Sequence, residues 1–398
     1  MCILIILKVK GGEDLKFKGY RRHDGRVGTR NKVLILPSVS CSAEASRLIS
    51  QQVPGTITIT NQYGCGQIGE DVNQTVRTLS GFAANPNIYG TIVVSLGCEV
   101  VQPDILTNKI QEMTNKPLEL IVIQEGGGIV NSIAKGVSSA RKMVQEMSLL
   151  EREDVDVSEL VVALECGGSD PTSGIAANPS VGLASDLIVA AGGTSIISET
   201  TEFIGAEHIF ARRAANTKVR DNLLKVVQQA EKRRHTYDPG GRNISPGNIK
   251  GGLSTIEEKS LGCLHKGGTA PLVEVLNYAQ RPSEKGLVMM DTPGYDVESV
   301  TGMVAGGAQI CVFTTGRGTP VGNPLVPVIK VTGNPDTFRK LNDIIDYNAG
   351  AILDGKISIT RASEEIFQEI LAVASGKITK AESLGFSEIG ISRMFGSV

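Results

Sequence analysis

The fold of this chain is indicated most clearly by residues 161–170, which read VVALECGGSD. Four apolar residues run into an acid, a cysteine and two glycines, and polar residues follow. In an open α/β sheet, ligands bind outside the carboxyl ends of the strands, and glycine there lets the backbone approach a ligand closely. The stretch therefore predicts a buried strand whose end faces a site.

Two earlier stretches also place a cysteine after a predicted strand. Residues 62–66 read QYGCG and residues 93–99 read VVSLGCE. Since cysteine can be a soft metal ligand or a nucleophile, we expect Cys65, Cys98 and Cys166 to line a site and to ligate or neighbour a metal. Each of them alone is also explained as a small buried apolar residue. No C-x-x-C spacing occurs, which disfavours an iron–sulfur cluster.

Strand and helix patterns alternate along the chain and predict its fold class. Strands are expected at 33–37, 56–60, 91–96, 118–124, 160–164, 194–198, 286–290, 309–313 and 326–331. Helices are expected at 43–52, 71–84, 103–114, 128–147, 181–191, 206–234 and 363–374. This alternation predicts an α/β protein of two α/β domains with mostly parallel, Rossmann-like sheets. A charged run at 151–156 marks the expected boundary between domains 1–152 and 153–398.

Length, charge and composition exclude several classes of protein. The 398 residues, 41% of them hydrophobic, are enough for two domains with full cores. The net charge is only −2, without basic runs interleaved with aromatics, so we expect no nucleic-acid partner. Seven scattered cysteines predict reduced thiols in a cytoplasmic protein. The apolar opening, residues 1–7, is too short to span a bilayer, and we expect no membrane association.

A basic segment just before the first strand contains Arg26, Arg30 and Asn31. Arginine forks match carboxylates in a bidentate way, so these residues are candidates for binding an acidic substrate. A solvated basic loop explains the segment equally well.

Acids and hydroxyls gather after the later strands. Ser169 and Asp170 lead into a helix whose N-terminus favours anions. Glu202, Glu207 and His208 follow the strand at 194–198, where carboxylates near a histidine suit hard-metal ligation or proton transfer. An ordinary amphipathic helix surface explains Glu207 and His208 equally well.

Three more polar stretches lie in predicted loops. Thr315 and Arg317 follow the strand at 309–313, and an arginine between two glycines can reach a substrate carboxylate, although turn roles alone also explain this pattern. Residues 125–128 read EGGG but do not complete a dinucleotide-binding motif, so a tight turn is favoured. The loop at 238–248 is rich in turn formers and is expected to be functional or mobile.

Taken together, these motifs resemble the altronate and galactarate dehydratase family. The matching segments are GRVGTRN (25–31), GCG (64–66), LGCE (96–99), CGGSD (166–170), GAEH (205–208), STIEEKSLG (254–262), MDTPGY (290–295) and FTTGRG (313–318). The resemblance extends from residue 19 almost to the C-terminus, and eight separated motifs in one order are far more specific than any single short motif.

The resemblance implies a cytoplasmic lyase that dehydrates sugar acids to 2-keto-3-deoxy acids, with Fe²⁺ as cofactor and Mn²⁺ or another divalent metal as the alternative. Removing a proton next to a carboxylate needs a base, a group that holds the developing charge, and an acid for the leaving hydroxide. It also implies that a small SAF-type (antifreeze-like) domain is supplied by a separate small subunit. A homo-oligomer is expected because two-fold assemblies are common.

The expected residue roles follow from these clusters. Candidates for acid, base or hard ligand are Glu99, Glu202, Glu207, His208 and Asp170; for the substrate, Arg26, Arg30, Asn31, Ser169, Thr315 and Arg317; and for the metal, Cys65, Cys98 and Cys166. Altronate is the favoured substrate, with galactarate dehydratase and (2R)-sulfolactate sulfo-lyase as alternatives. A non-catalytic sugar-acid-binding protein and a nicotinamide oxidoreductase are the alternatives from other classes.

Overall fold

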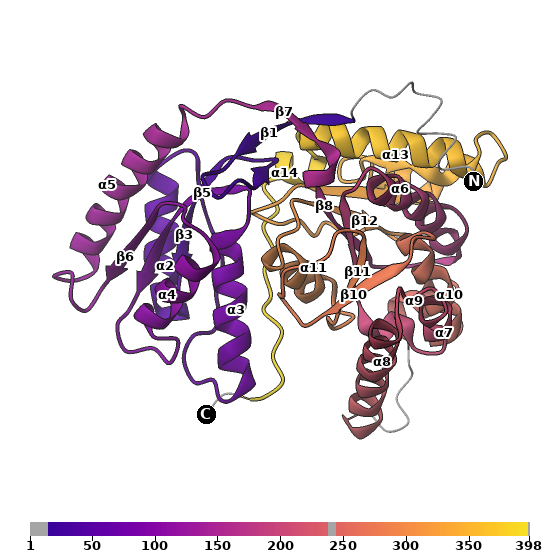
Figure 1. Ribbon diagram of the computed structural model, residues 1–398, viewed down its shortest axis with the longest axis horizontal. Coiled ribbons are helices and arrows are strands. Elements are labelled where there is room, and N and C mark those ends of the chain that lie inside the picture. The colour runs from indigo at the N-terminus through magenta and orange to yellow at the C-terminus, as the bar shows by residue number, and fades with distance from the viewer. Residues whose placement is uncertain (1–14, 238–243, 397–398) are drawn as a thin grey trace.

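The computed structural model describes residues 15–237 and 244–396 (Figure 1). The apolar opening at 1–7 and residues 238–243 of the turn-rich loop therefore lie outside the described residues.

The N-terminal half is built around a four-stranded parallel sheet with the order β4-β3-β5-β6. Its strands are β3 (Lys32–Pro37), β4 (Thr56–Thr58), β5 (Ile88–Ser95) and β6 (Leu118–Val122). Its helices are α2 (Ser40–Gln52), α3 (Glu70–Ala84), α4 (Pro103–Met113) and α5 (Ile129–Met147). Every residue of β5 is buried, as expected of a central strand covered on both faces.

A small antiparallel sheet stands beside the two halves, with the order β2-β1-β7. It consists of β1 (Lys16–Arg21), β2 (Val27–Gly28) and β7 (Glu153–Asp156), and Phe17 pairs with Val155. The chain therefore returns to its own beginning before it enters the second large sheet.

The C-terminal half contains a seven-stranded parallel sheet with the order β10-β11-β9-β8-β12-β13-β14. Its strands are β8 (Val161–Cys166), β9 (Thr194–Ile197), β10 (Leu272–Leu276), β11 (Leu287–Met290), β12 (Ile310–Thr314), β13 (Val328–Thr332) and β14 (Tyr347–Asn348). The prediction of an α/β protein with mostly parallel sheets is thus confirmed.

The helical segments of this half connect the strands. The α-helices are α6 (Asn178–Ala190), α7 (Glu207–Ala211), α8 (Thr217–Tyr237), α9 (Pro246–Lys250), α10 (Ile256–Leu264), α11 (Asp296–Ala305), α12 (Pro335–Lys340), α13 (Ile359–Ala374) and α14 (Lys380–Leu384). Short 3₁₀ or π segments are η1 (Val157–Glu159), η2 (Ser173–Ala177), η3 (Thr200–Phe203), η4 (His265–Gly267) and η5 (Ala349–Ile352).

The two halves share one apolar core between their sheets. Figure 1 shows α3 and α11 side by side at this junction, and the two helices pack against each other. Leu79 and Phe82 of α3 belong to the same buried cluster as Val300 and Met303 of α11. The outer faces are covered by α2 and α5 in the N-terminal half and by α6 and α13 in the C-terminal half.

Two buried asparagines fasten the halves at the amino end of β5. The Asn85 Nδ2 atom donates to the carbonyl oxygens of Val304 (2.9 Å) and Ala308 (2.8 Å). The Asn87 Nδ2 atom donates to the carbonyl oxygens of Gln309 (3.0 Å) and Leu325 (3.1 Å). Because these contacts satisfy buried polar groups from both halves, we infer that the halves are held in a fixed relation.

The large sheet has a switch point between β8 and β12. From β8 the chain crosses to its neighbour β9 on one side, and from β12 it crosses to β13 on the other side. In open α/β sheets the crevice at such a point, outside the carboxyl ends of the strands, is the usual ligand site.

The single helix expected at 206–234 is wrong, because the structure has two helices, α7 and α8. Between them, Leu272 donates to the Arg213 carbonyl (3.1 Å) and accepts from the Ala215 amide (2.8 Å). The Asn216 side chain then accepts from the Val219 amide (3.0 Å) and begins α8. Pairing with Leu272, the first residue of β10, thus interrupts the helix that the periodicity of the sequence predicts as continuous.

Within the described ranges, no helix combines the length and apolar character needed to cross a membrane.

Lys330 gives the fold a testable dependence on pH. It lies fully buried on β13, and its Nζ atom has no hydrogen-bond partner in the described structure. Burial lowers the pKa of Lys330 from 10.5 to about 8, despite the attraction of Asp346. Between these two values the unfolded chain binds more protons than the folded chain, so the wild-type stability rises with pH across this window.

We therefore predict that Lys330→Met raises the free energy of unfolding at pH 7 by up to about 3 kcal/mol. The gain should shrink as the pH rises above 8, because the wild-type ammonium then loses its proton. Urea unfolding at pH 7 and pH 10 measures this, with Lys285→Met, a change at an exposed lysine, as the control. A variant that is less stable at pH 7, or that gains equally at both pH values, would contradict the explanation.

Candidate active site

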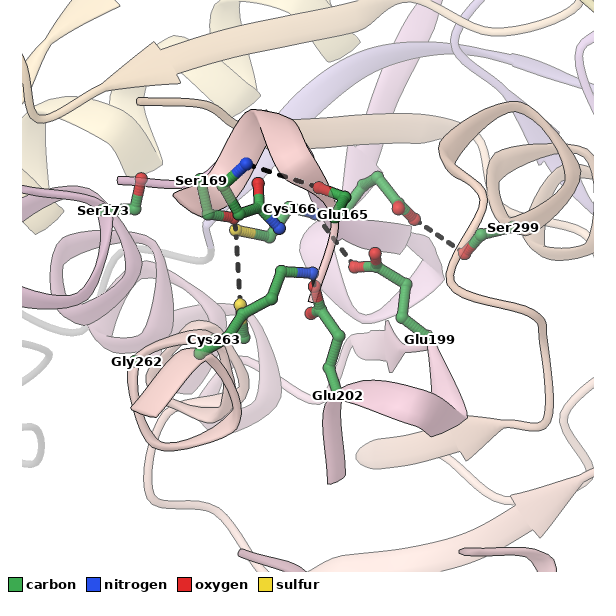
Figure 2. Close-up of polar contacts among 12 residues, drawn as sticks. Glu165, Cys166, Ser169, Ser173, Glu199, Glu202, Gly262, Cys263 and Ser299 are labelled. Carbon is green, nitrogen blue, oxygen red and sulfur yellow. Dashed lines mark hydrogen bonds and ion pairs between the residues drawn. The ribbon is translucent and has the colours of Figure 1, made fainter. Parts of the chain in front are cut away.

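The candidate site forms where the central strands of the large sheet end. β8 ends with Glu165 and Cys166, and Glu199 follows β9 one residue after Ser198. Glu199 has a left-handed backbone conformation, with φ of 66°, which is uncommon for a residue with a side chain and is often found at functional sites. Figure 2 shows the side chains of Glu165, Cys166, Glu199 and Cys263 gathered in one place.

Two lysines meet two carboxylates beneath this strand edge. The Lys266 Nζ atom on η4 lies 2.6 Å from Glu199 Oε2 and 2.7 Å from Glu202 Oε2, and all three side chains are almost fully buried. Lys259, on α10, pairs with the other oxygen of Glu202. Buried charges of this kind are stable only when they are paired and hydrogen-bonded.

The charges of these lysines and carboxylates determine the protonation states of Glu202 and Lys266. Burial opposes ionisation of Glu202, but Lys259 and Lys266 outweigh it and lower the pKa of Glu202 to about 2. Burial also opposes the charge of Lys266, yet Glu199 and Glu202 hold its pKa well above the usual value. Glu202 and Lys266 therefore both stay charged at neutral pH and form an ion pair beneath the strand ends.

Three carboxyl groups of this site, Glu199 among them, share too little positive charge. Ligand oxygens of Glu165, Glu199 and Asp296 all lie within 4.8 Å of one another. Burial raises the pKa of Glu165 to about 8, and burial with the nearby acids Glu165 and Glu202 raises that of Glu199 well above the usual value. Burial and the charge of Glu202 also raise the pKa of Asp296.

The same three groups meet the requirements of a cation site. The buried atoms Glu165 Oε1 and Glu199 Oε1 have no hydrogen-bond partner among the described residues. Four carboxyl groups, counting Glu202, face only two lysines, so the cluster needs protons or a cation to be neutral. Oxygen ligands of this kind suit a hard or borderline divalent metal. The residues present therefore fit a divalent metal ion.

Two thiols lie next to the charged cluster. The Cys166 Sγ atom is 3.7 Å from Cys263 Sγ and 3.1 Å from Ser169 Oγ, and Asn178 Nδ2 donates to it at 3.6 Å. The hydrogen bond from Cys263 lowers the pKa of Cys166 to about 6, although burial opposes this. Cys166 is therefore the ionised member of the pair at neutral pH, and the pKa of Cys263 is correspondingly raised.

A cavity of about 740 Å³ opens above this cluster. Lys259 and Asp296 line it from below, and Gly167 and Gly168 bring the end of β8 to its wall. A side chain at Gly167 would collide with the Asp296 carboxylate, so glycine there leaves Asp296 in its position.

Two arginines also contribute to the cavity wall. Arg234 and Arg317 line it, and the Arg317 guanidinium donates to the Gly247 carbonyl at 2.6 Å. The cavity thus offers cationic groups at its wall and, in Asp296, one member of the carboxylate cluster. That combination suits a small anionic ligand that has both a carboxylate and hydroxyl groups.

Several residues singled out in the sequence belong to this neighbourhood. Glu202 and Cys166 are in the cluster, Arg317 lines the cavity, and Ser169 contacts the Cys166 thiol. The Thr315 hydroxyl accepts from the Gly318 amide (2.9 Å) and so shapes the loop that carries Arg317.

Asp170, Glu207 and His208 are placed differently. The Asp170 carboxylate accepts from Thr172 Oγ1 (2.6 Å), the Ser173 amide (3.0 Å) and Asn334 Nδ2 (2.9 Å), and it lines a smaller neighbouring cavity. Glu207 and His208 lie on α7 and line a separate cavity.

The remaining candidates lie in the N-terminal half. Glu99 is buried and accepts from Ser38 Oγ and Ser95 Oγ, both at 2.5 Å, and from the Gly97 amide at 2.6 Å. Burial opposes its charge, but these hydrogen bonds outweigh it and lower the pKa of Glu99. Cys65 and Cys98 are exposed on the same half. The three predicted metal-ligating cysteines are therefore divided between two sheets, and within the described part their sulfurs do not all lie within 4.8 Å of one another.

The predicted substrate ligands of the N-terminal half flank β2 and precede β3. They are Arg26, Arg30 and Asn31. Arg30 pairs with Glu382 at 2.7 Å, Arg26 pairs with Asp24, and the Asn31 amide donates to the Met147 carbonyl at 3.1 Å. These contacts link segments of the chain. None of the three predicted substrate ligands is among the described residues that line the cavity above Lys259.

Six residues of the site were not predicted: Glu165, Glu199, Lys259, Cys263, Lys266 and Asp296. Glu165 and Glu199 each follow an apolar run, and an acid at that point of a buried strand was the available signal. Lys259, Cys263 and Lys266 come from one helical stretch that resembles a surface helix in sequence, so only the fold reveals their burial.

Removing the central lysine tests the structural part of this description. We predict that Lys266→Met lowers the free energy of unfolding by about 3–5 kcal/mol, because it leaves buried carboxylates without their partner. Lys285→Met is the matched control, since its ion pair with Glu159 is exposed and should contribute less than about 1 kcal/mol. Chemical denaturation at pH 7 measures both, and equal effects of the two changes would show that the Lys266 bridge is not needed for stability.

Comparison with known proteins identifies the family. The family model described as D-galactarate/altronate dehydratase, C-terminal, matches residues 157–396. The model described as D-galactarate dehydratase/altronate hydrolase, second domain, matches residues 19–148. The cavity, the carboxylate cluster and its lysines all fall within the first of these regions.

Individual relatives agree with these models. The (2R)-sulfolactate sulfo-lyase subunit beta of Chromohalobacter salexigens is 38% identical over 388 residues, covering 96% of this chain and 98% of that protein. The altronate dehydratase of Bacillus subtilis is 35% identical over 390 residues, covering 95% and 78%. The galactarate dehydratase (L-threo-forming) of Escherichia coli is 37% identical over 389 residues, covering 92% and 74%. The chain therefore belongs to the D-galactarate/altronate dehydratase family.

Proposed function

We propose that this protein is a sugar-acid dehydratase, a hydro-lyase that converts an aldonate, most readily altronate, to a 2-keto-3-deoxy acid. The observation that supports this most is a cavity that combines the cationic side chains of Lys259 and Arg317 with Asp296, a member of the carboxylate cluster. Dehydration next to a carboxylate needs both kinds of group: positive groups bind the acid, and the groups around the cluster hold a cation or move protons.

Substrate binding is assigned to the cavity wall. Arg317 and Lys259 both line the cavity, and a guanidinium fork suits a carboxylate in a bidentate way. Lys259 lies between the cavity and Glu202, and the nearby acids and thiols hold its pKa well above the usual value although burial opposes its charge. It can therefore stabilise the negative charge that develops beside the substrate carboxylate when the proton is removed.

A divalent metal ion is assigned to Glu165, Glu199 and Asp296. Glu165 and Glu199 each have a buried oxygen without a partner among the described residues, and the excess negative charge of the three groups fits a cation. When bound, Fe²⁺ or a similar ion would act as a Lewis acid toward substrate oxygens.

Proton removal is assigned to Cys166. Its pKa of about 6 makes it a thiolate at neutral pH, and a base works best when its pKa lies near the working pH. It directly precedes Gly167, which lines the cavity. Asn178 and Ser169 contact its sulfur and hold it in position.

The sulfo-lyase relative favours a second candidate function. In that reaction sulfite leaves in place of water, and the same removal of a proton beside a carboxylate precedes it. Because that relative is called subunit beta, we also propose that this protein works with a separate small SAF-type subunit. We also propose that the protein forms a homo-oligomer and is located in the cytoplasm.

Anaerobic turnover with Fe²⁺ tests the function directly. Altronate, galactarate and (2R)-sulfolactate should be compared with and without a small SAF-type subunit, with 2-keto acid and sulfite measured as products. We predict keto acid without sulfite from altronate. Sulfite release would instead establish the sulfo-lyase, and no product from any of the three with the subunit present would contradict both.

The same assay tests the role of Cys166. We expect Cys166→Ser to fold normally, because serine is close in size, and to lower kcat much more than it changes KM. Cys311→Ser is a control for general effects of removing a buried thiol, since Cys311 lies within β12 and away from the cavity lining. A fully active Cys166→Ser enzyme would contradict the assignment.

A further inference from the structure

Three exposed cysteines stand at the carboxyl edge of the N-terminal sheet. Cys41 lies in the first turn of α2, directly after β3; Cys65 lies in the loop after β4; and Cys98 lies in the loop after β5. β4, β3 and β5 are adjacent and parallel, so their carboxyl ends meet at one edge. The topology therefore brings three thiols from distant parts of the sequence to the same edge.

The loops that carry these thiols are locked together by the backbone. The Ser40 amide donates to the Tyr63 carbonyl at 3.0 Å, which joins the Cys41 turn to the Cys65 loop. The Val101 amide donates to the Gly64 carbonyl at 2.9 Å, which joins the Cys65 loop to the Cys98 loop.

Two further features make this junction close and rigid. Gly64 has φ of 104°, and any side chain there would collide with the backbone of Ser38 and Val39. The buried Glu99 carboxylate accepts from Ser38 Oγ, Ser95 Oγ and the Gly97 amide, so it ties the end of β3 to the end of β5. The relative positions of the three cysteines are therefore determined by the fold.

The surroundings of the thiols are those of a ligand site and not of a packed core. Cys41, Cys65 and Cys98 are exposed, whereas Cys166, Cys263 and Cys311 are buried. A cysteine that serves only as a small apolar residue is normally buried. Ile68, Val100 and Val130 are exposed apolar residues at the same edge of the sheet, and an apolar rim limits access of water to a metal centre.

The strand order indicates what the thiols can hold, because neighbouring strands lie about 4.8 Å apart and these thiols follow three adjacent strands. A single tetrahedral ion with metal–sulfur bonds of about 2.3 Å needs sulfurs roughly 3.8 Å apart. Within the described residues, only Glu165, Glu199 and Asp296 bring three ligand atoms within 4.8 Å of one another, so the three sulfurs are not gathered around one ion. An iron–sulfur cluster is a wider body and is held by thiolates that stand further apart.

We propose that Cys41, Cys65 and Cys98 form a binding site for an iron–sulfur cluster of the [4Fe–4S] type, in which three irons have a cysteine ligand and one has none. The absence of a C-x-x-C motif does not oppose this site, because its ligands come from three neighbouring strand ends and not from one loop. The site is separate from the carboxylate cluster on the other sheet and does not depend on the identity of the substrate.

The test is anaerobic reconstitution of the full chain with iron salts and sulfide, followed by desalting, iron and sulfide analysis and visible absorption. We expect about four irons and four sulfides per chain with a broad visible absorption band. Cys41→Ser, Cys65→Ser and Cys98→Ser should each lose most of the bound iron, sulfide and absorption. Since these thiols are exposed, far-ultraviolet circular dichroism should show that the variants keep the wild-type fold.

Two controls make the outcome specific. Gln62→Ala changes an exposed residue of the Cys65 loop, and Cys166→Ser removes a thiol from the other sheet; both should keep the full cluster. The proposal is overturned if the wild type retains iron without sulfide, or if the three variants retain as much of both as the controls. The experiment measures iron content, sulfide content and visible absorption, so its result does not depend on whether the protein is an active dehydratase.

Discussion

The rest of the site depends on one interaction, the bridge that Lys266 forms between Glu199 and Glu202. Three charged side chains are buried at the end of a parallel sheet, where their desolvation costs several kcal/mol per ion unless each finds a partner. With Lys266 in place, Glu202 stays ionised and Glu199 is held beside Glu165. The remaining negative charge of the carboxyl groups can be neutralised by protons or by a divalent cation. The neighbouring cavity, with its cationic wall, can bind an anionic substrate.

Much of the fold could be predicted from local patterns. Apolar runs such as 161–164 and 91–96 recur between helical segments, and this rhythm is enough to indicate parallel sheets. The error at 206–234 has a physical cause, because Leu272 pairs with Arg213 and Ala215 from a distance of more than fifty residues in sequence. Periodicity describes one segment at a time and cannot report a partner that another segment supplies.

The candidate site was predicted less completely for a related reason. Cysteine and glycine at strand ends predicted a site at the carboxyl edge of a sheet, and Cys166, Glu202 and Arg317 lie at or beside the candidate site of the seven-stranded sheet. Lys266 and Lys259 could not be found, since a lysine in a helical stretch is normally exposed and only tertiary packing buries it. Conversely, Arg30 is the type of residue that binds a substrate carboxylate, but its guanidinium contacts Glu382 and three backbone carbonyls of the same chain.

The proposed chemistry requires that the carboxyl groups of Glu165, Glu199 and Asp296, which outnumber the nearby lysines, hold a cation. Crystals of the protein soaked with Mn²⁺ and measured at the manganese absorption edge would locate the ion by its anomalous scattering. We predict a single strong peak between the carboxylate oxygens of Glu165, Glu199 and Asp296, next to the cavity lined by Lys259 and Arg317. A peak elsewhere in the molecule, with these three side chains free of metal at saturating Mn²⁺, would contradict this prediction.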